Sequence, residues 1–184
     1  MQGWGSKEYA MNQKSSLYIG ELKSTTLGNL WLAVSDLGLI AVEWSQSQVE
    51  FKAYLTKRFK RPVEYNPDKV RDPSRELSEY LTGKRRQFTI PIDWSLMRPF
   101  QQAALQATFA IPYGETRTYG ELAAHIGRPR AARAVGRAEA TNPMPLVIPC
   151  HRVIGADGKL HGYGGGEGLP TKEWLLKMEG AVIA

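Results

Sequence analysis

Cysteine is almost absent from this chain, which has one, Cys150, among 184 residues. A single thiol excludes an intramolecular disulfide framework and any zinc or iron–sulfur site built from several thiolates of this chain alone. Histidine is scarce as well, and its three positions do not have the i, i+4 spacing that places two metal ligands on one helix face. The sequence therefore predicts no metal site.

Long hydrophobic runs are also lacking. No stretch approaches the roughly 18 apolar residues of a membrane span, and the first sixteen residues lack the continuous apolar core of a secretory signal. With 42% hydrophobic residues, the chain can still bury a sizeable core. We expect a cytoplasmic protein of one domain or two small ones, with no membrane partner.

Acidic residues are outnumbered by basic ones, 18 to 24, which gives a net charge of +6. Residues 117–152 hold six arginines, no lysine and two acids. The rigid fork of arginine suits phosphates and base edges better than a lysine point charge does. On charge alone, either a nucleic-acid surface or a solvated basic face fits this pattern.

The N-terminal half predicts a small α/β domain over residues 16–93, after a polar segment, residues 1–15, that we expect to be flexible. Short apolar or alternating runs separated by glycine-containing turns predict strands, and helical spacing follows them. The strands are expected at 16–22, 30–34, 39–44 and 87–92, and the helices near 47–60 and 74–82.

Residues 94–184 predict a second, mostly helical domain, which begins with a helix over 100–109. Thr118 and Glu121 have the spacing of a capping box, which predicts a helix from Thr118 to about Ile126, and Pro129 is placed to begin the next helix. Two short helices with arginines on the second are typical of a helix-turn-helix. An alanine-rich helix that is merely tightly packed is the alternative.

Cys150 is followed directly by His151, after an apolar, strand-like stretch and a proline. A cysteine needs a base or a positive environment to become the nucleophilic thiolate, and the imidazole is in place to act as that base. Neighbours on an extended segment point to opposite sides, so a bridging water would be required. Without other context, a lone cysteine is usually a small buried apolar side chain.

Several motifs around Cys150 resemble the O6-alkylguanine-DNA alkyltransferase family, closely over about residues 97–180 and weakly over the N-terminal half. They occur in family order: Ile111-Pro112-Tyr113-Gly114, Thr118-Tyr119-Gly120-Glu121-Leu122-Ala123, Ala131-Ala132-Arg133-Ala134-Val135-Gly136, Asn142-Pro143, Ile148-Pro149-Cys150-His151-Arg152-Val153, and Lys172-Glu173-Trp174-Leu175-Leu176 with Glu179. The resemblance implies a ribonuclease H-like N-terminal domain and a helix-turn-helix in the C-terminal one.

The resemblance also implies an activity. The protein would flip O6-alkylguanine, and O4-alkylthymine, out of double-stranded DNA and transfer the alkyl group irreversibly to Cys150. A thioether has no easy leaving route, so each chain would react once and would need no cofactor. A monomer without an obligate protein partner is implied, with cooperative assembly along DNA left open. The structural zinc of some relatives is not expected here, because its thiolate ligands are missing.

Individual roles follow from the same resemblance. His151 is the water-mediated base, Glu179 the carboxylate that orients it, and Tyr119 the donor to the guanine ring as it leaves. In DNA binding, Arg133 is the finger that fills the space of the extruded base. The other implied DNA contacts are Arg128, Gln101, Ala132 and Gly136, and the implied pocket residues are Val153, Tyr163, Gly164 and the supporting hinge residue Asn142.

Two features depart from the family pattern. The glycine-rich loop at residues 162–168 leaves two more residues than expected before Lys172. Glu139 is an acid on the helix expected to face DNA; it would weaken binding if it faced the phosphates, and the alternative is that it points away from them.

Two functions of other classes remain open. The first is a binding module that flags alkylated guanine for other repair machinery, as the alkyltransferase-like proteins do, but those proteins replace the cysteine. A basic transcription regulator with an incidental cysteine would leave the segment from Pro149 to Val153 unexplained. The presence of Cys150, His151, Glu179 and Tyr119 together favours alkyl transfer.

Overall fold

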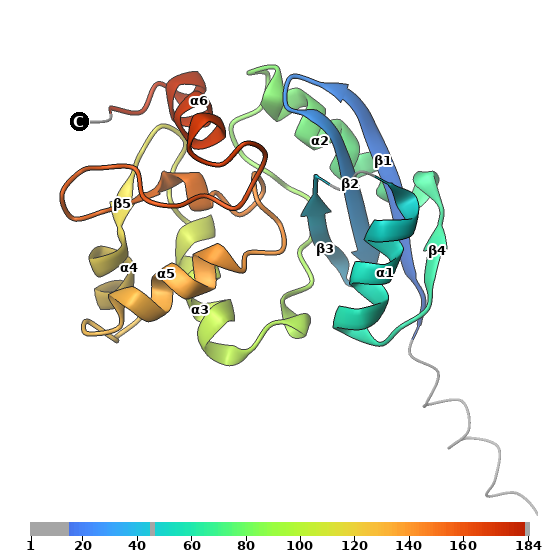
Figure 1. The fold of residues 1–184 in the computed structure, drawn as a ribbon, viewed down its shortest axis with the longest axis horizontal. Helices are drawn as coiled ribbons and strands as arrows, with labels where there is room; N and C mark the ends of the chain where they lie inside the picture. The colour runs from blue at the N-terminus through green and yellow to red at the C-terminus, as the bar shows by residue number, and fades with distance from the viewer. Residues whose placement is uncertain (1–14, 45–46, 183–184) are drawn as a thin grey trace, which may run out of the picture.

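The computed structural model describes residues 15–44 and 47–182, so the predicted flexible segment, residues 1–15, lies outside it except for Ser15. The N-terminal strands and two helices form one half of the molecule, and the remaining helices form the other half (Figure 1). Within the described residues, no helix is long and apolar enough to cross a membrane.

The N-terminal half is built on a four-stranded sheet of order β3-β2-β1-β4. Its strands are β1 (Leu17–Thr25), β2 (Gly28–Ser35), β3 (Gly38–Glu43) and β4 (Val63–Tyr65). The β1–β2 and β2–β3 pairs are antiparallel, and β4 pairs with β1 in parallel. The strands predicted at 16–22, 30–34 and 39–44 are confirmed, whereas β4, with three residues, was too short to predict.

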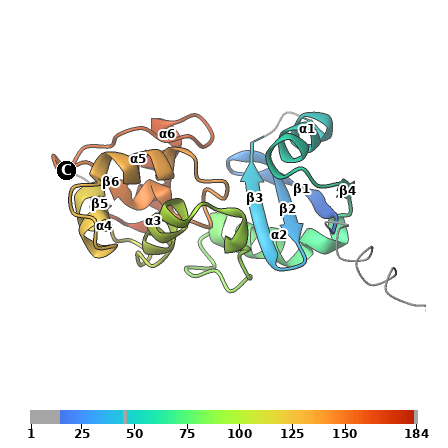
Figure 2. The same ribbon diagram turned by 90° about the horizontal axis from the view of Figure 1, so that it is seen from below.

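Helices α1 (Gln48–Phe59) and α2 (Arg71–Leu81), the latter preceded by the 3-10 helix η2 (Pro67–Val70), cover opposite faces of this sheet (Figure 2). Side chains alternate along β2, because successive residues of a strand point to opposite faces. Trp31 packs in one cluster with Phe51 of α1, and Leu32 packs in another with Leu77 of α2. The sheet is therefore buried on both sides.

The strand predicted at 87–92 is wrong. The backbone N–H groups of Thr89 and Ile90 donate to the carboxylate of Glu76 on α2, at 2.8 and 3.4 Å. A helix side chain thus takes the donors that a strand would offer to a neighbouring strand. Only an isolated bridge between Leu39 and Ile92 joins this segment to the sheet.

The C-terminal half packs short helices around the segment that carries Cys150. Its elements are η3 (Trp94–Leu96), α3 (Pro99–Phe109), β5 (Arg117–Thr118), α4 (Tyr119–His125), α5 (Ala132–Ala140), η4 (Cys150–Arg152), β6 (Val153–Ile154) and α6 (Leu169–Glu179). Apolar side chains of α3, α4 and α5 form one buried cluster that includes Leu122 and Val135. Strands β5 and β6 pair in parallel, which places Arg117 opposite Val153.

The helix-turn-helix consists of α4 and α5. The predicted capping box is confirmed, since Thr118 accepts from the backbone of Glu121 while the Glu121 side chain accepts from the backbone of Thr118. The predicted start of the second helix at Pro129 is wrong. The N–H of Ala131 bonds to the carbonyl of Arg128 at 2.8 Å, so residues 128–131 form a turn and α5 begins at Ala132.

The two halves share one hydrophobic core. The largest cluster joins Leu32 and Leu77 of the N-terminal half to Leu105 and Ile148 of the C-terminal half. The N–H of Val42 on β3 also donates to the carbonyl of Pro143 at 2.8 Å. The sheet therefore supports the loop that leads to Cys150.

Candidate active site

Cys150 is the first residue of η4 and is 8% exposed. The strand-like stretch predicted before it is wrong, because residues 143–149 form turns held by Asn142. The Asn142 side chain accepts from the N–H of Met144 at 3.0 Å and donates to the carbonyl of Ile148 at 2.9 Å. Leu146 adopts a positive φ of 76° within this loop. Asn142 thus fixes the turn that presents the cysteine.

The thiol of Cys150 is neutral at rest. Burial and, to a smaller extent, the nearby carboxylate of Glu139 raise its pKa to about 12. A hydrogen bond from Asn142 and the charge of Lys172 act in the opposite direction but do not outweigh burial. A thiol in this environment needs a base that takes its proton as it reacts.

His151 is such a base. Its side chain is fully buried, and burial lowers the pKa of the imidazole, which keeps it neutral. Nε2 lies 3.0 Å from Oε1 of Glu179, whereas Nδ1 has no hydrogen-bond partner among the described residues. With the Nε2 proton donated to the carboxylate, Nδ1 carries the lone pair that can accept a proton.

Glu179 ends α6, just before Gly180, which takes the left-handed conformation with φ 72°. Two nitrogens of Arg152 donate to its carboxylate, each at 2.8 Å, and the N–H of Gly114 donates at 3.1 Å. Burial alone would raise its pKa, but hydrogen bonds from His151 and Arg152 hold that pKa well below the usual 4.5. The imidazole therefore always meets an ionised partner at neutral pH.

Two members of this network were missed by the sequence analysis. Arg152 could have been found from the sequence, because it directly follows Cys150 and His151 in the motif that resembles the alkyltransferase family. Tyr80 could not, because it lies on α2 in the other half of the molecule. Its hydroxyl donates to Oε1 of Glu179 at 2.6 Å and lies 3.3 Å from Nε2 of His151.

Replacement of Tyr80 by phenylalanine should weaken both the fold and the transfer reaction. The variant loses one buried hydrogen bond to a charged acceptor, which is worth about 2 kcal/mol. Urea unfolding should report that loss, and the single-turnover rate should fall because Glu179 is held less firmly. Tyr65→Phe, at a half-exposed residue of β4, is the matched control and should change neither quantity. Equal behaviour of the two variants would contradict a role for Tyr80 in the site.

A cavity of about 390 Å³ lies beside Cys150. It is lined by Tyr119, Gly136, Glu139, Ala140, Cys150, Gly162, Tyr163 and Gly164. Four residues expected at the site, Tyr119, Gly136, Tyr163 and Gly164, are therefore brought together with the cysteine. Val153 does not line the cavity: it is fully buried, and its carbonyl accepts from Nζ of Lys172 at 2.6 Å.

The glycine-rich loop packs against the N-terminal half. A Cβ on Gly165 would lie 2.8 Å from the ring of Tyr163 and 2.9 Å from that of Trp44. Such distances are too short for any other residue, so glycine is required where the loop passes between the two rings. The loop thereby holds Tyr163 against the cavity.

Glu139 does not face the surface, which settles the two orientations left open above. It is 7% exposed, and its Oε1 accepts from the hydroxyl of Thr108 on α3 at 2.7 Å. Burial raises its pKa to about 7, against the opposing effect of the Thr108 hydrogen bond. The carboxyl group belongs to the wall of the Cys150 cavity.

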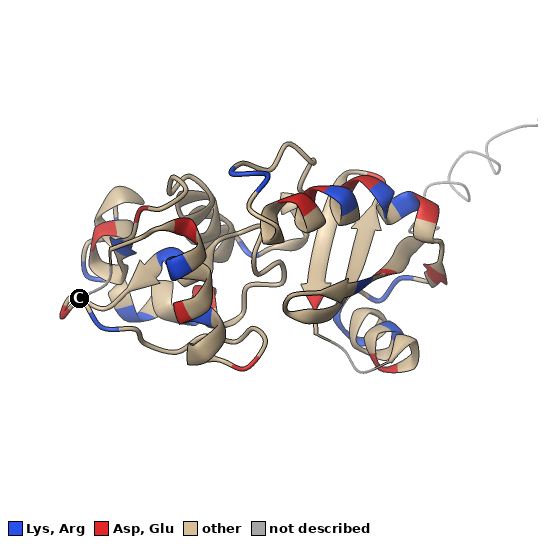
Figure 3. Ribbon diagram, turned by 90° about the horizontal axis from the view of Figure 1, so that it is seen from above, with Lys and Arg blue, Asp and Glu red and all other residues tan. Residues whose placement is uncertain are grey.

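The residues expected to contact DNA differ in their exposure and in their contacts within the protein. Arg133 on α5 and Arg128 in the preceding turn are exposed and form no ion pair with any described residue. Ala132 is half-buried at the start of α5. Gln101 uses its amide N–H group within the protein, donating to Thr141 at 3.0 Å. Lysine and arginine occur in both halves of the molecule (Figure 3).

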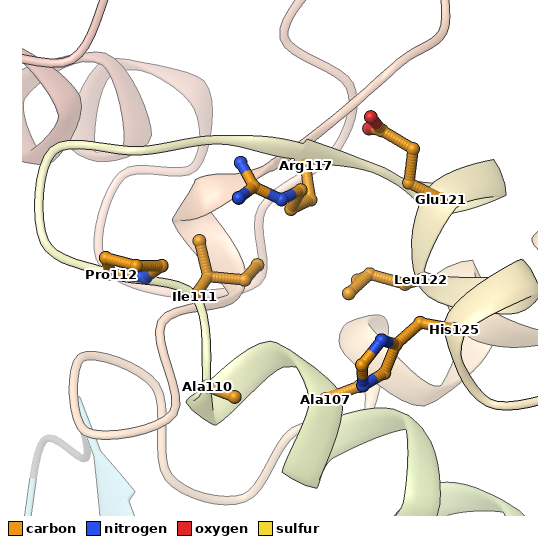
Figure 4. Close-up of a pocket in the computed structure, with 8 residues that line it drawn as sticks. All are labelled: Ala107, Ala110, Ile111, Pro112, Arg117, Glu121, Leu122 and His125. Carbon is orange, nitrogen blue, oxygen red and sulfur yellow. The ribbon is translucent and has the colours of Figure 1, made fainter.

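A second cavity, of about 350 Å³, lies between α3, α4 and β5 (Figure 4). Arg117, Glu121 and His125 line it together with apolar side chains such as Leu122. It contains none of the residues expected at the site. This second cavity therefore lacks the cysteine nucleophile that lines the first one.

Hydrogen bonding singles out the Cys150 cavity in another way. Three buried side-chain atoms in the described part of the chain have no hydrogen-bond partner: Oε2 of Glu139, Nδ1 of His151 and the hydroxyl of Tyr163. Buried polar atoms are almost always paired, because leaving one unpaired costs free energy. Two of them belong to residues that line the Cys150 cavity, and the third belongs to His151, the next residue after Cys150. The site is thus prepared to bond something other than the chain itself.

Comparison with known proteins gives two matching family models. The model described as "6-O-methylguanine DNA methyltransferase, ribonuclease-like domain" matches residues 17–94, and the model described as "6-O-methylguanine DNA methyltransferase, DNA binding domain" matches residues 99–181. A methylated-DNA--protein-cysteine methyltransferase of Methanosarcina barkeri is 40% identical over 161 residues, 86% of this chain and 95% of the relative. One of Salmonella typhimurium is 39% identical over 166 residues, 87% and 94% of the two chains.

Solved structures agree with these matches. The O6-methylguanine methyltransferase of Mycobacterium tuberculosis has a TM-score of 0.72 at 37% identity, over 89% of this chain and 93% of that one. A structure of OGT from the same organism in complex with DNA has a TM-score of 0.71 at 35% identity, over 90% and 93%. The expected fold class, a strand-rich α/β half followed by a helical half with a helix-turn-helix, is confirmed.

Proposed function

The chain belongs to the 6-O-methylguanine DNA methyltransferase family, and we propose that Cys150 is the residue on which it takes up the alkyl group. It is a DNA-binding repair protein that transfers alkyl groups from damaged DNA to its own cysteine. The observation that supports the assignment of Cys150 is its position: it lines a cavity and is followed directly by His151, whose Nδ1 is unpaired and whose Nε2 faces the clamped carboxylate of Glu179.

The reaction assigns one task to each group. Nδ1 of His151 takes the thiol proton through a bridging water, and Sγ of Cys150 attacks the alkyl carbon of O6-alkylguanine. A sulfur–carbon bond forms, the carbon–O6 bond breaks, and its electron pair stays on the guanine. Tyr119 donates a hydrogen bond or proton to the leaving guanine, which ends unalkylated with one proton gained; the proton that His151 took from the thiol replaces the one given to the guanine, so the imidazole and the phenol both end neutral. The protein ends as a thioether and is consumed.

Glu179 makes His151 effective without touching the substrate. It fixes the imidazole tautomer that leaves Nδ1 free, and its charge stabilises the imidazolium that forms when the thiol proton arrives. Arg152 and Tyr80 in turn hold the carboxylate, so they are positioning residues. Val153 and Asn142 shape the surroundings of the pocket rather than its surface.

DNA approaches through the helix-turn-helix in this proposal. Arg133 projects from α5 as the finger that fills the space left by the flipped base, and Arg128 binds phosphate. The exposure of both guanidinium groups supports these roles. Small residues such as Ala132 and Gly136 on the same helix allow close approach to the groove. The internal hydrogen bonds of Gln101 leave its side-chain oxygen for DNA.

The remaining expectations concern organisation. We infer two domains that divide near residue 93, which the family matches over 17–94 and 99–181 support. We propose that the protein is a monomer that acts on DNA in the cytoplasm. O4-alkylthymine is proposed as a secondary substrate, because its alkyl carbon, like that of O6-alkylguanine, is bonded to an exocyclic oxygen of the base.

The function is tested with duplex DNA that carries O6-methylguanine with a labelled methyl group. We expect label on the protein, saturating near one methyl per chain, and unmodified guanine in the product DNA. Tight lesion binding without label transfer would favour a lesion-binding protein instead. No preference for the lesion would leave only a general DNA-binding protein.

Arg128→Ala should reduce the salt dependence of DNA binding. Each phosphate contact releases a counterion, so the slope of log affinity against log salt should become shallower by about one. Arg75→Ala is the control, because Arg75 lies on α2 and pairs there with Asp72. Fluorescence anisotropy over a series of salt concentrations measures both slopes. An unchanged slope for Arg128→Ala would exclude a phosphate contact at this position.

A further inference from the structure

Glu139 is a feature of the site that the alkyl-transfer steps do not use. It is more than nine-tenths buried, and it lines the cavity with Cys150. One carboxyl oxygen accepts from Thr108, and the other, Oε2, has no partner among the described residues. Because an unpaired buried carboxyl oxygen costs free energy, a cavity occupant that donates a hydrogen bond to it is favoured.

The position of Glu139 brings it to the reacting end of the cavity. Gly136 precedes it by one helical turn on α5, and both residues line the cavity, so this face of the helix turns toward Cys150. The charge of Glu139 raises the pKa of both Cys150 and Tyr119, the two groups assigned to the reaction. Among the described residues that line the cavity, Glu139 is the one acidic side chain.

The geometry of the reaction decides which part of a substrate meets this oxygen. The alkyl carbon must touch Sγ for attack, so the atoms beyond it lie in the same end of the cavity as Glu139. An apolar chain would cover Oε2 without giving it a donor. A chain that ends in a hydroxyl group can donate to it.

We propose that Glu139 is a specificity-determining residue that favours O6-alkyl adducts carrying a hydrogen-bond donor on the chain, such as 2-hydroxyethyl, over apolar chains of the same size. The inference rests on the proposed function, since it concerns the alkyl group that Cys150 accepts. Lys172 supports it: its ammonium group is fully buried, bonds to the carbonyls of Val153 and His161 at 2.6 and 2.9 Å, and attracts the carboxylate electrostatically.

The test compares single-turnover transfer from duplexes that carry O6-propylguanine and O6-(2-hydroxyethyl)guanine, which differ only in a terminal methyl or hydroxyl group. Transfer from O6-methylguanine is measured in parallel as the reference. Above about pH 8, where Glu139 with its pKa of about 7 is ionised, hydroxyethyl transfer by the wild type should be about tenfold or more faster than propyl transfer, the effect of one hydrogen bond to a charged acceptor.

Two variants separate polarity from shape. Glu139→Met fills a similar volume without an acceptor, and the Thr108 hydroxyl keeps the carbonyl of Ala104, at 3.1 Å, as its partner. The hydroxyethyl-to-propyl ratio should fall to one or below in this variant. Glu139→Gln keeps an acceptor oxygen without the charge and should stay within about threefold of the wild-type ratio.

Each outcome decides the inference. The role of Glu139 is overturned if the wild type transfers hydroxyethyl and propyl groups equally fast, or if the hydroxyethyl-to-propyl ratio is the same in the wild type and in Glu139→Met. In either case, transfer from O6-methylguanine by the wild type leaves the proposed function standing. Absence of methyl transfer in the wild type refutes the proposed function itself. If Glu139→Met does not fold, as judged by circular dichroism, the wild-type ratio decides alone.

Discussion

Cys150→Ala is expected to abolish alkyl transfer completely while DNA that carries O6-methylguanine still binds. The reaction needs a sulfur nucleophile beside His151, and no other cysteine exists in the chain. The contacts expected to bind DNA lie on α3, on α5 and in the turn before α5, so they do not depend on the thiol. Labelled-DNA transfer and anisotropy binding measured on the same preparation report the two properties separately.

Cys150→Ser is the matched control for this prediction. Serine keeps a small polar side chain in the same turn, but its hydroxyl is a far weaker nucleophile than a thiol at neutral pH. Both variants should give no protein label and lesion affinities within a few-fold of each other. Label on either variant would mean that another residue accepts the alkyl group.

Glu179→Ala is expected to have the largest effect on stability. Arg152 is 6% exposed, and the change removes the carboxylate that it donates to with two nitrogens. A buried charge left without its partner costs about 3–5 kcal/mol. The transfer rate of the remaining folded protein should fall by roughly 100-fold, because the imidazole loses the group that orients it. Urea unfolding and single-turnover kinetics measure these losses.

The control and the pH dependence make this prediction specific. Glu173→Ala removes a surface ion pair with Lys177 on the same helix and should cost only about 0.5 kcal/mol. Because the pKa of Glu179 is depressed in the folded state, its stabilisation is present above the unfolded value of 4.5 and is lost as pH falls below it. The gap between wild type and variant should therefore narrow in acid. A pH-independent gap would contradict an ionised Glu179.

Local patterns in the sequence were sufficient to predict much of the fold. The short apolar run within β2 predicts a strand because both faces of that strand are buried, one against α1 and the other against α2. The capping box at Thr118 predicts the start of α4 because both of its hydrogen bonds lie within four residues. The helix predicted to end near Ile126 ends there, and Gly127 follows it in the left-handed conformation with φ 70°.

Contacts between distant segments could not be predicted in this way. The segment 87–92 has the composition of a strand, yet its donors are taken by Glu76. Asn142 folds the residues before Cys150 into turns by side-chain bonds that a hydrophobic pattern does not reveal. Pro129 fits the first turn of a helix, but the hydrogen bond from Ala131 to Arg128 delays α5.

In the candidate site, too, some residues could be predicted from the sequence and others depend on contacts between distant segments. Cys150, His151 and Glu179 were expected from a resemblance in sequence, and the structure brings them together. Tyr80 reaches the network only because the two halves share a core, and no local pattern marks it. The inward orientation of Glu139 follows from its bond to Thr108 on another helix. Tertiary packing decides both.

The central claim is that Cys150 itself becomes the thioether. The most direct test is to react the wild-type protein with excess O6-methylguanine duplex, digest it with protease and fragment the peptides by mass spectrometry. The account predicts one added methyl group per chain, on the peptide that contains Cys150 and localised to its sulfur. A methyl group on any other residue, or an unmodified Cys150 peptide after the DNA lesion has disappeared, would contradict it.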